Sequence, residues 1–279
     1  MNVDSSATDR RVDVLGVQVN VLNVHQACEI IEGWIRQRAK RYVCITGAHG
    51  VMESRRDERL RSILNQAGMV TADGMPLVWF SRFIRKAPAR RVYGPDLMRA
   101  LTAISPARGY RHFYYGGPPG IVEKLKAKME CEHPGIDVVG TITPPFRQLT
   151  RAEDDAVVQC INAARPDIVW VGLSTPKQEV WMARHVERID APVLIGVGAA
   201  FDFLAGTKRQ APRWMQRSGL EWFFRLATEP RRLWRRYAYI VPGFALLSAR
   251  ELVKHWLRRH PEETNSSGSN EVSLRVDAP

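Results

Sequence analysis

The sequence predicts an α/β protein with a Rossmann-like fold: mostly parallel sheets with helical cover, plus a basic helical C-terminal appendage. Two observations predict the α/β body. Short apolar runs alternate with segments of helical periodicity from residue 12 to residue 206, and glycine-bearing turns follow several of these runs. A third observation predicts the appendage, because arginines and aromatic residues are concentrated after residue 206. A chain of 279 residues with 45% hydrophobic residues is long enough to bury a sizeable core.

The first part of the body, residues 12–105, is predicted to form one α/β subdomain. Strict alternation of apolar and polar residues predicts strands, and apolar residues at helical spacing predict helices. In chain order these patterns predict a strand pair at 12–22, a helix at 24–40, a buried strand running into a turn at 42–52, a helix at 54–67, a strand at 69–72, and helices from residue 75 and over 97–104.

The pattern then restarts, which predicts a second α/β subdomain over residues 106–206 after a linker near Pro106. Its elements are a strand and turn at 111–120, a helix at 121–130, a strand at 137–143, a helix at 152–164, a strand leading into a helix at 167–189, and a strand and turn at 193–206. Residues 1–11 are expected to be flexible. The polar tail, residues 261–279, is expected to be disordered.

Cysteine usage and the absence of long apolar runs indicate a cytoplasmic protein. The four cysteines lie far apart with no C-x-x-C pair, which argues against a zinc site, a redox motif and a disulfide framework. The first twenty residues lack the apolar core of a signal peptide, and no run reaches the ~18 apolar residues that a spanning helix needs. We therefore expect the protein on the cytosolic side of the membrane.

The net charge of +12 is concentrated in the appendage, residues 207–260, which contains 13 Lys and Arg against 3 acidic residues. Tryptophan, tyrosine and arginine together suit an anionic bilayer surface. Two alternatives use the same residue types: RNA binding, and packing of the appendage onto the body through its aromatic residues. We favour a peripheral membrane surface and expect no nucleic-acid partner. The arginines expected to face the membrane surface are Arg213, Arg217, Arg225, Arg231, Arg232 and Arg235.

Asp73 is the leading candidate for a catalytic residue. It follows the apolar run 69–72 and precedes Gly74, so it is expected where a strand ends and a helix begins. In open α/β sheets this edge forms the binding crevice. A carboxylate there can act as a general base if partial burial raises its pKa. The alternative is that Asp73 only caps the helix that starts near Met75.

Three turns of the second subdomain are predicted to lie at one edge of its sheet, at 116–120, 172–179 and 196–202. Backbone N–H groups of such turns can cradle a diphosphate. Lys177 is placed to meet a phosphate and Gln178 a sugar hydroxyl, although an exposed helix start uses the same residues for solubility. The turn at 196–202 fails the dinucleotide fingerprint because Phe201 replaces the third glycine, which weakens an NAD-dependent oxidoreductase.

Four segments in series resemble the WecG/TagA/CpsF family of bacterial glycosyltransferases. They are TADGMPLVW, RVYGPDLM, VGLSTPKQEVWM and the long segment from GVGAAFD to RRLWRRY, within a resemblance that covers about residues 12–240. The resemblance implies inverting transfer of a hexosyl or N-acetylhexosaminyl group from a UDP-sugar to a polyprenyl-diphosphate-linked acceptor. It places the protein peripherally on the inner face of the plasma membrane, in surface-polysaccharide or wall-polymer synthesis, without an essential metal or other cofactor.

The same resemblance implies roles for individual residues. Asp73 matches the family's proposed general base, and the appendage arginines are implied to meet the lipid diphosphate as well as the membrane. The resemblance implies that Arg91, Gly94, Asp96 and Gln178 border the substrate pocket, and we expect Thr46, Gly47, His49 and Gly74 at the same site. The positions expected at the nucleotide are Gly116, Gly117, Gly172, Lys177, Gly198, Phe201 and Asp202.

The chain departs from the family pattern at one place, and the sequence leaves two other protein classes open. Many members carry Thr-x-Asn after the second strand, where this chain has Thr46 and His49 but no asparagine. Either residue could replace the amide, or the donor sugar could differ. The competing classes are a nucleotide-binding α/β protein associated with RNA and an NAD-dependent oxidoreductase. A homo-oligomer is also left open by the sequence.

Overall fold

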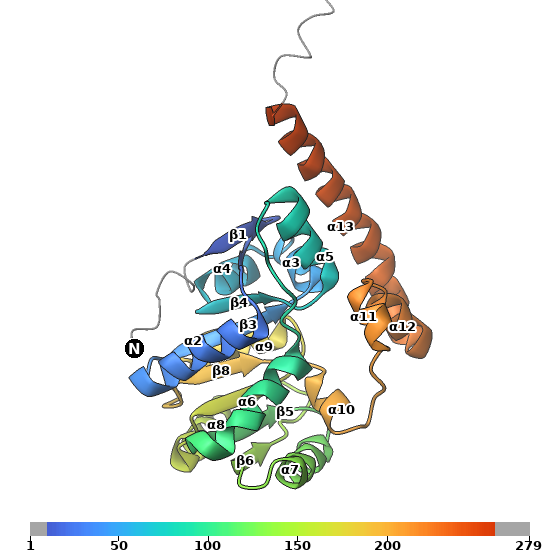
Figure 1. The fold of residues 1–279 in the computed structure, drawn as a ribbon. Coiled ribbons are helices and arrows are strands. Elements are labelled where there is room, and N and C mark those ends of the chain that lie inside the picture. The colour runs from blue at the N-terminus through green and yellow to red at the C-terminus, as the bar shows by residue number, and fades with distance from the viewer. Residues whose placement is uncertain (1–9, 260–279) are drawn as a thin grey trace, which may run out of the picture.

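The structure is a computed structural model that describes residues 10–259, so the tail predicted at 261–279 and most of the predicted flexible N-terminus lie outside the described residues. Its centre is a six-stranded sheet in the order β4-β3-β8-β7-β5-β6, with every neighbouring pair parallel (Figure 1). The strands are β3 (Arg41–Thr46), β4 (Met69–Ala72), β5 (Arg111–Gly116), β6 (Asp137–Ile142), β7 (Ile168–Gly172) and β8 (Val193–Gly196). The predicted Rossmann-like α/β fold is confirmed.

Helices cover both faces of the sheet, and each face has its own apolar core. One face packs against α2 (Val24–Gln37), α6 (Gly94–Arg108), α7 (Ile121–Glu132) and α10 (Ala200–Leu204). The other packs against α4 (Glu58–Gln66), α8 (Arg151–Ala164), α9 (Lys177–His185) and the antiparallel ribbon of β1 (Arg11–Val14) and β2 (Val17–Asn20). The near-continuous burial of β3, β7 and β8 explains why these strands are apolar runs without alternation.

Three short helices and the appendage surround the carboxyl end of β4. The short helices are α3 (Ala48–Ser54), α5 (Met75–Trp79) and the π-helix η1 (Phe80–Ile84). The appendage consists of α11 (Arg213–Arg217), α12 (Glu221–Thr228) and the long helix α13 (Pro230–Arg259). Figure 1 shows α13 rising beside α3 and α5, and contacts join it to α3 and η1.

The predicted boundary near Pro106 is wrong. Pro106 lies inside α6, close to its C-terminal end, where Gly109 caps the helix with a left-handed backbone. The proline removes one backbone hydrogen bond of the helix, and α6 nevertheless continues through it to Arg108. Strand β8 from the second half of the chain pairs with β3 from the first half, joining Arg41 with Val193. The two predicted subdomains therefore share one sheet.

Candidate active site

Asp73 lies directly after β4, at the carboxyl edge of the sheet. Its backbone N–H donates to the carbonyl of Thr46 at 2.9 Å, which ties the end of β4 to the end of β3. The backbone N–H of Gly94 donates to the Asp73 carboxylate. The helix after Asp73 begins at Gly74, and no side chain of the described residues caps it. The capping alternative is therefore wrong, and the carboxylate faces a pocket instead.

Burial controls the charge state of Asp73. It raises the pKa of the carboxyl from 3.8 to about 6, although Arg91 and Arg225 act in the opposite direction. The group is consequently ionised at neutral pH but more basic than an ordinary aspartate. These are the properties that a general base for a hydroxyl requires.

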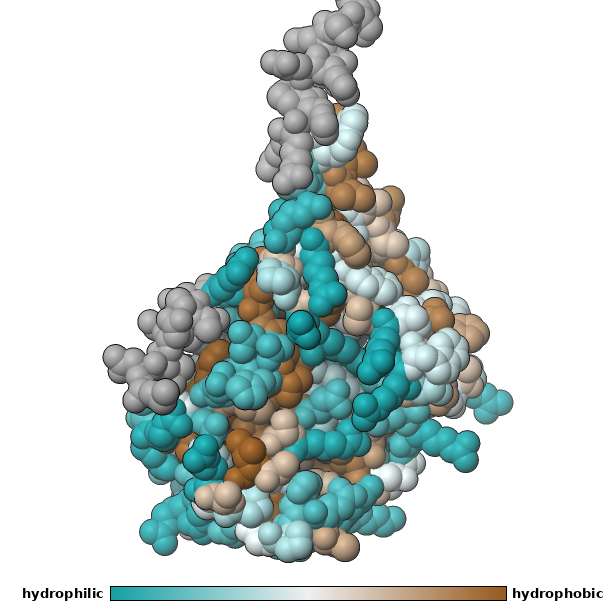
Figure 2. Space-filling view, in the orientation of Figure 1, coloured by the Kyte–Doolittle hydropathy of each residue, from teal (hydrophilic) through white to brown (hydrophobic). Residues whose placement is uncertain are grey.

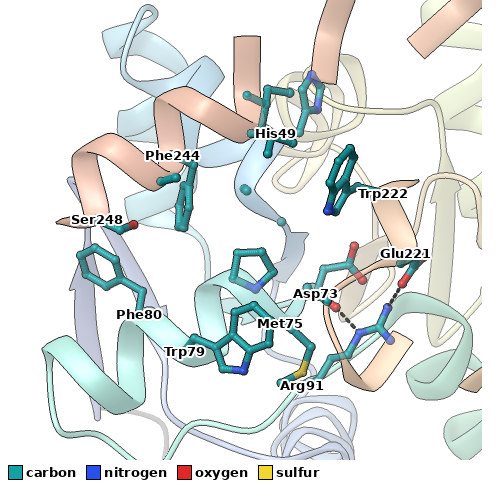
Figure 3. Close-up of a pocket in the computed structure, with 18 of the residues that line it drawn as sticks. His49, Asp73, Met75, Trp79, Phe80, Arg91, Glu221, Trp222, Phe244 and Ser248 are labelled. Carbon is teal, nitrogen blue, oxygen red and sulfur yellow. Dashed lines mark hydrogen bonds and ion pairs between the residues drawn. The ribbon is translucent and has the colours of Figure 1, made fainter. Parts of the chain in front are cut away.

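Arg91 connects the Asp73 strand end to the appendage. Its Nε donates to the Asp73 carbonyl, while Nη1 donates to Gln216 Oε1 at 3.0 Å and Nη2 to Glu221 Oε2 at 2.5 Å (Figure 3). The guanidinium also lies 4.0 Å from the centroid of the Tyr93 ring. The ring face and the three acceptors hold Arg91 in one orientation beside the candidate base.

The pocket around Asp73 has a volume of about 530 Å³ and is formed jointly by body and appendage. Of the predicted substrate-contacting positions, Gly47, His49, Gly74 and Arg91 line it. Burial, together with Arg236 and Arg225, lowers the pKa of His49 to about 4. His49 is therefore neutral at pH 7 and can offer one ring N–H and one acceptor nitrogen to a ligand.

Thr46 and Gln178 lie beneath the pocket rather than on its surface. Both are buried, and within the described residues Thr46 Oγ1 and Gln178 Oε1 have no hydrogen-bond partner. The Gln178 amide donates to Glu179 Oε1, which also accepts from the Thr175 hydroxyl at 2.8 Å. Unpaired buried polar atoms are costly, so this cluster is a site where a bound group or a water would be stabilised.

Two predicted positions behave differently from the expectation. Asp96 is not among the residues that line the pocket: its side chain is 53% exposed and pairs with Arg99 on the first turn of α6. An acid there stabilises the helix N-terminus from the solvent side. Gly94 contributes through its backbone alone, by the bond to Asp73 described above.

A second pocket of about 990 Å³ lies at the carboxyl ends of β5, β7 and β8. Gly117, Gly172 and Gly198 line it, as the three glycine turns predicted. Gly116 lies just behind this lining. Its φ is +118°, and a Cβ at this position would lie 2.7 Å from the Gly172 backbone, so the two turns approach this closely only because residue 116 is glycine; at Gly172 a Cβ would instead meet the Phe201 ring at 2.5 Å.

The remaining predicted nucleotide positions also lie at this second pocket. Lys177 is exposed at the start of α9, and Asp202 forms a 3.7 Å ion pair with Lys208. Phe201 is only 1% exposed and tilts against the Tyr114 ring at a centroid distance of 5.8 Å. Its ring therefore supports the glycine turns from below, which gives a packing reason for the missing third glycine.

The appendage arginines divide into two groups. Arg225 lines the first pocket and Arg232 the second. Arg232 is itself exposed, as are Arg213, Arg217, Arg231 and Arg235, which line neither pocket. Large exposed hydrophobic side chains gather on the same helices, including Trp214, Phe223, Trp234 and Leu246. Figure 2 shows such side chains over α13.

Residues 10–259 contain no helix with both the length and the apolar character needed to cross a bilayer. They also contain no group of three or more His, Cys, Asp or Glu side chains arranged to hold a metal ion. Independence from metals remains a prediction.

Sequence reasoning missed the residues that attach the appendage to the site. Glu221 and Gln216 hold Arg91, and Trp222 covers the pocket above Asp73 (Figure 3). One signal was available. Glu221 is one of only three acidic residues in a strongly basic segment, which marks it as a specific partner for an arginine of the body.

A candidate base in one of two pockets at the carboxyl edge of a parallel sheet is an arrangement suited to an enzyme that joins two substrates. Comparison with known proteins shows that this enzyme is a glycosyltransferase: residues 12–258 match the family described as "Glycosyl transferase WecG/TagA/CpsF family". The chain belongs to that family. The match supports neither an RNA-associated regulator nor an NAD-dependent oxidoreductase.

Curated relatives agree with this assignment over nearly their whole length. In Staphylococcus aureus strains NCTC 8325 and COL, an N-acetylglucosaminyldiphosphoundecaprenol N-acetyl-beta-D-mannosaminyltransferase is 25% identical over 256 residues, covering 91% of this chain and 99% of the relative. The protein of the same name from strain MRSA252 gives the same identity and coverage.

Proposed function

We propose that this glycosyltransferase moves an N-acetylhexosaminyl group, with inversion, from a UDP-sugar to a saccharide linked to polyprenyl diphosphate. The observation that carries the proposal is the Asp73 carboxylate, held at a pocket by the ends of β3 and β4 with a pKa of about 6. The relatives' names describe transfer of an N-acetylmannosaminyl group to an undecaprenyl-diphosphate-linked N-acetylglucosamine. UDP-N-acetylmannosamine is therefore the first donor to test.

In the proposed reaction Asp73 accepts the proton of the acceptor hydroxyl. The hydroxyl oxygen forms a bond to the anomeric carbon of the donor as the bond from that carbon to the UDP oxygen breaks. The UDP oxygen keeps the bonding electron pair, so charge grows on the leaving diphosphate. A single displacement from the face opposite the leaving group inverts the anomeric centre.

The second pocket is the proposed site of the UDP moiety. Turns from three neighbouring strands form its wall, and Lys177, Lys208 and Arg232 add positive charge. Several cations around one pocket suit a diphosphate. Arg225 lines the first pocket, and its guanidinium is 5.9 Å from the ring of Phe203 on α10. This position suits a cation that stabilises the charge developing on the leaving group.

The appendage is proposed to hold the enzyme on the inner face of the membrane. Exposed tryptophans and arginines on the same helices support this, because such rings settle at headgroup depth while cations meet anionic lipids. We expect Trp214→Ser combined with Trp234→Ser to weaken co-sedimentation with phosphatidylglycerol vesicles. Phe146→Ser, an exposed aromatic of the body, is the matched control. Equal vesicle binding by all variants would contradict peripheral attachment.

Calorimetric titration with UDP tests the donor site, with NAD as the control ligand. Binding of UDP but not NAD supports the proposal, and a panel of UDP-hexoses and UDP-N-acetylhexosamines then identifies the donor through release of UDP in the presence of a lipid-linked acceptor. Binding of NAD alone would contradict the proposal. Lysine-to-alanine exchange at Lys177 and Lys208 should weaken UDP binding if the second pocket is the site.

A further inference from the structure

The pocket beside Asp73 changes character along its length. Its inner end contains Asp73, Arg91 and Glu221, whereas its outer end lies between η1 and α13 and is lined by apolar side chains (Figure 3). These include Trp79, Phe80, Phe83, Phe244 and Leu252. A sugar needs polar partners for its hydroxyls, so this apolar end is suited to a different part of a ligand.

The floor of the apolar end is preformed. Phe80 and Phe244 are buried, and their ring centroids are 6.3 Å apart. Helix α13 approaches α3 closely at Gly243, where a Cβ would lie 2.8 Å from Met52 Cε. Packing therefore fixes α13 against the body, and the groove beside it does not depend on a ligand to form.

The rim of the groove is apolar and open to solvent. Phe83 of η1 and Leu252 of α13 both line the pocket and are both exposed. Exposed apolar side chains that gather around a concave surface mark a binding site for an apolar ligand.

A cation lies at the inner end of this groove. Arg225 lines the same pocket and affects the pKa of both Asp73 and His49, so it is close to the candidate base. The same pocket therefore offers a base for a hydroxyl, a guanidinium suited to phosphate, and an apolar groove. A saccharide joined through diphosphate to a hydrocarbon carries the three matching groups.

We propose that the groove between η1 and α13 binds the first isoprenyl units of the acceptor, next to its diphosphate. The protein itself then recognises part of the lipid, in addition to any attraction between the appendage and the bilayer. This inference rests on the proposed function and adds the hydrocarbon to the chemistry that the site recognises.

The test uses the full chain in buffer without vesicles or detergent, so that the bilayer cannot contribute. Calorimetry compares dimethylallyl, geranyl and farnesyl diphosphates, which carry the same head group on one, two and three isoprenyl units. We expect the Kd to fall by about tenfold or more from the shortest to the longest, because each added unit buries hydrocarbon. Equal Kd values for the three would overturn the proposal.

Two neighbouring residues of α13 provide a matched pair of variants. Leu252 lines the groove and is 49% exposed, whereas Val253 lies outside it and is 55% exposed. We expect Leu252→Asn to weaken binding of farnesyl diphosphate about tenfold and Val253→Asn to leave it unchanged. Ala249→Trp, which places a ring in the groove, should abolish the dependence on chain length. Equal losses in Leu252→Asn and Val253→Asn would contradict the proposal.

The outcomes separate this inference from the proposed function. Chain-length-dependent binding without sugar transfer to any acceptor would contradict the function and leave the groove assignment standing. Transfer with a KM that is the same for short-chain and long-chain acceptors would contradict the groove and leave the function standing. If dihexanoyl phosphatidylglycerol binds as tightly as farnesyl diphosphate and is equally weakened by Leu252→Asn, the groove belongs to bilayer lipid and the proposal is overturned.

Discussion

The end of β4 and the appendage contribute to the same pocket but are built in opposite ways. Asp73 follows a fully buried strand and is fixed by backbone bonds to Thr46 and Gly94. Helices α11 and α12 contain no buried residue, yet Gln216 and Glu221 from them orient Arg91 beside Asp73. The comparison teaches that the candidate base is positioned by the core of the fold, whereas its surroundings are completed by a surface segment.

The sharpest test of this comparison removes the base while preserving its support. Asp73→Asn should lower kcat by about 10³-fold, within the range for a general base, because an amide cannot accept the proton. The variant should also be more stable by roughly 1–3 kcal/mol at pH 7, because folding raises the pKa of Asp73 and so disfavours its ionised form. This gain is expected above pH 6 and should vanish below about pH 4. Full turnover by the variant would refute the assignment, and thermal unfolding measures the stability.

A smaller effect is expected from loosening the appendage. Glu221→Gln replaces a charge-assisted bond to the partly buried Arg91 with a neutral one and should reduce kcat/KM by roughly 10-fold to 100-fold. Glu58→Gln is the control, because Glu58 pairs with Arg61 on the exposed surface and neither residue lines either of the two pockets. If both variants keep full activity in the UDP-release assay, the appendage does not complete the site.

The pH profile should reveal the charge state of Asp73. Because the ionised carboxylate is the active form, kcat/KM should fall below a pKa of about 6 and be roughly tenfold lower at pH 5 than at pH 7. His49, with a pKa of about 4, should remain neutral over this range. An acid limb centred near pH 4 instead would show that burial does not tune the base.

The smallest effect is expected at Asp96, which was predicted to border the pocket but lies on the exposed first turn of α6. Asp96→Asn should change kcat/KM by less than about twofold and stability by roughly 0.5 kcal/mol, as for a surface pair. A large loss of activity would indicate that Asp96 reaches the substrate in a conformation other than this one.

The sequence predicted the parts of the molecule that depend on local patterning. The apolar runs predicted β3, β4, β7 and β8, and the position of Asp73 after β4 followed from the run and the glycine beside it. The pairing of β8 with β3 was not predictable, because strand neighbours in a parallel sheet are chosen by long-range packing. The proline near the end of α6 was mistaken for part of a linker, because proline inside a helix is uncommon.

At the site, local reasoning found the residues of the body and missed their partners. The glycine turns predicted the second pocket. Glycine is needed there because the backbone at Gly116 lies so close to that of Gly172 that a Cβ would not fit. The contacts of Arg91 with Gln216 and Glu221 span more than a hundred residues, and composition alone assigned those residues to a basic surface.

The insertion of β8 between β3 and β7 has a consequence for how the chain is made. Synthesis delivers β3 and β4 early, yet the edge of β3 that receives β8 has no partner until residue 196 has left the ribosome. Until then an unpaired apolar strand is a template for association with other chains. Because closing so long a loop precedes the pairing, the sheet should form late and slowly, so newly made protein depends on chaperones to hold this edge.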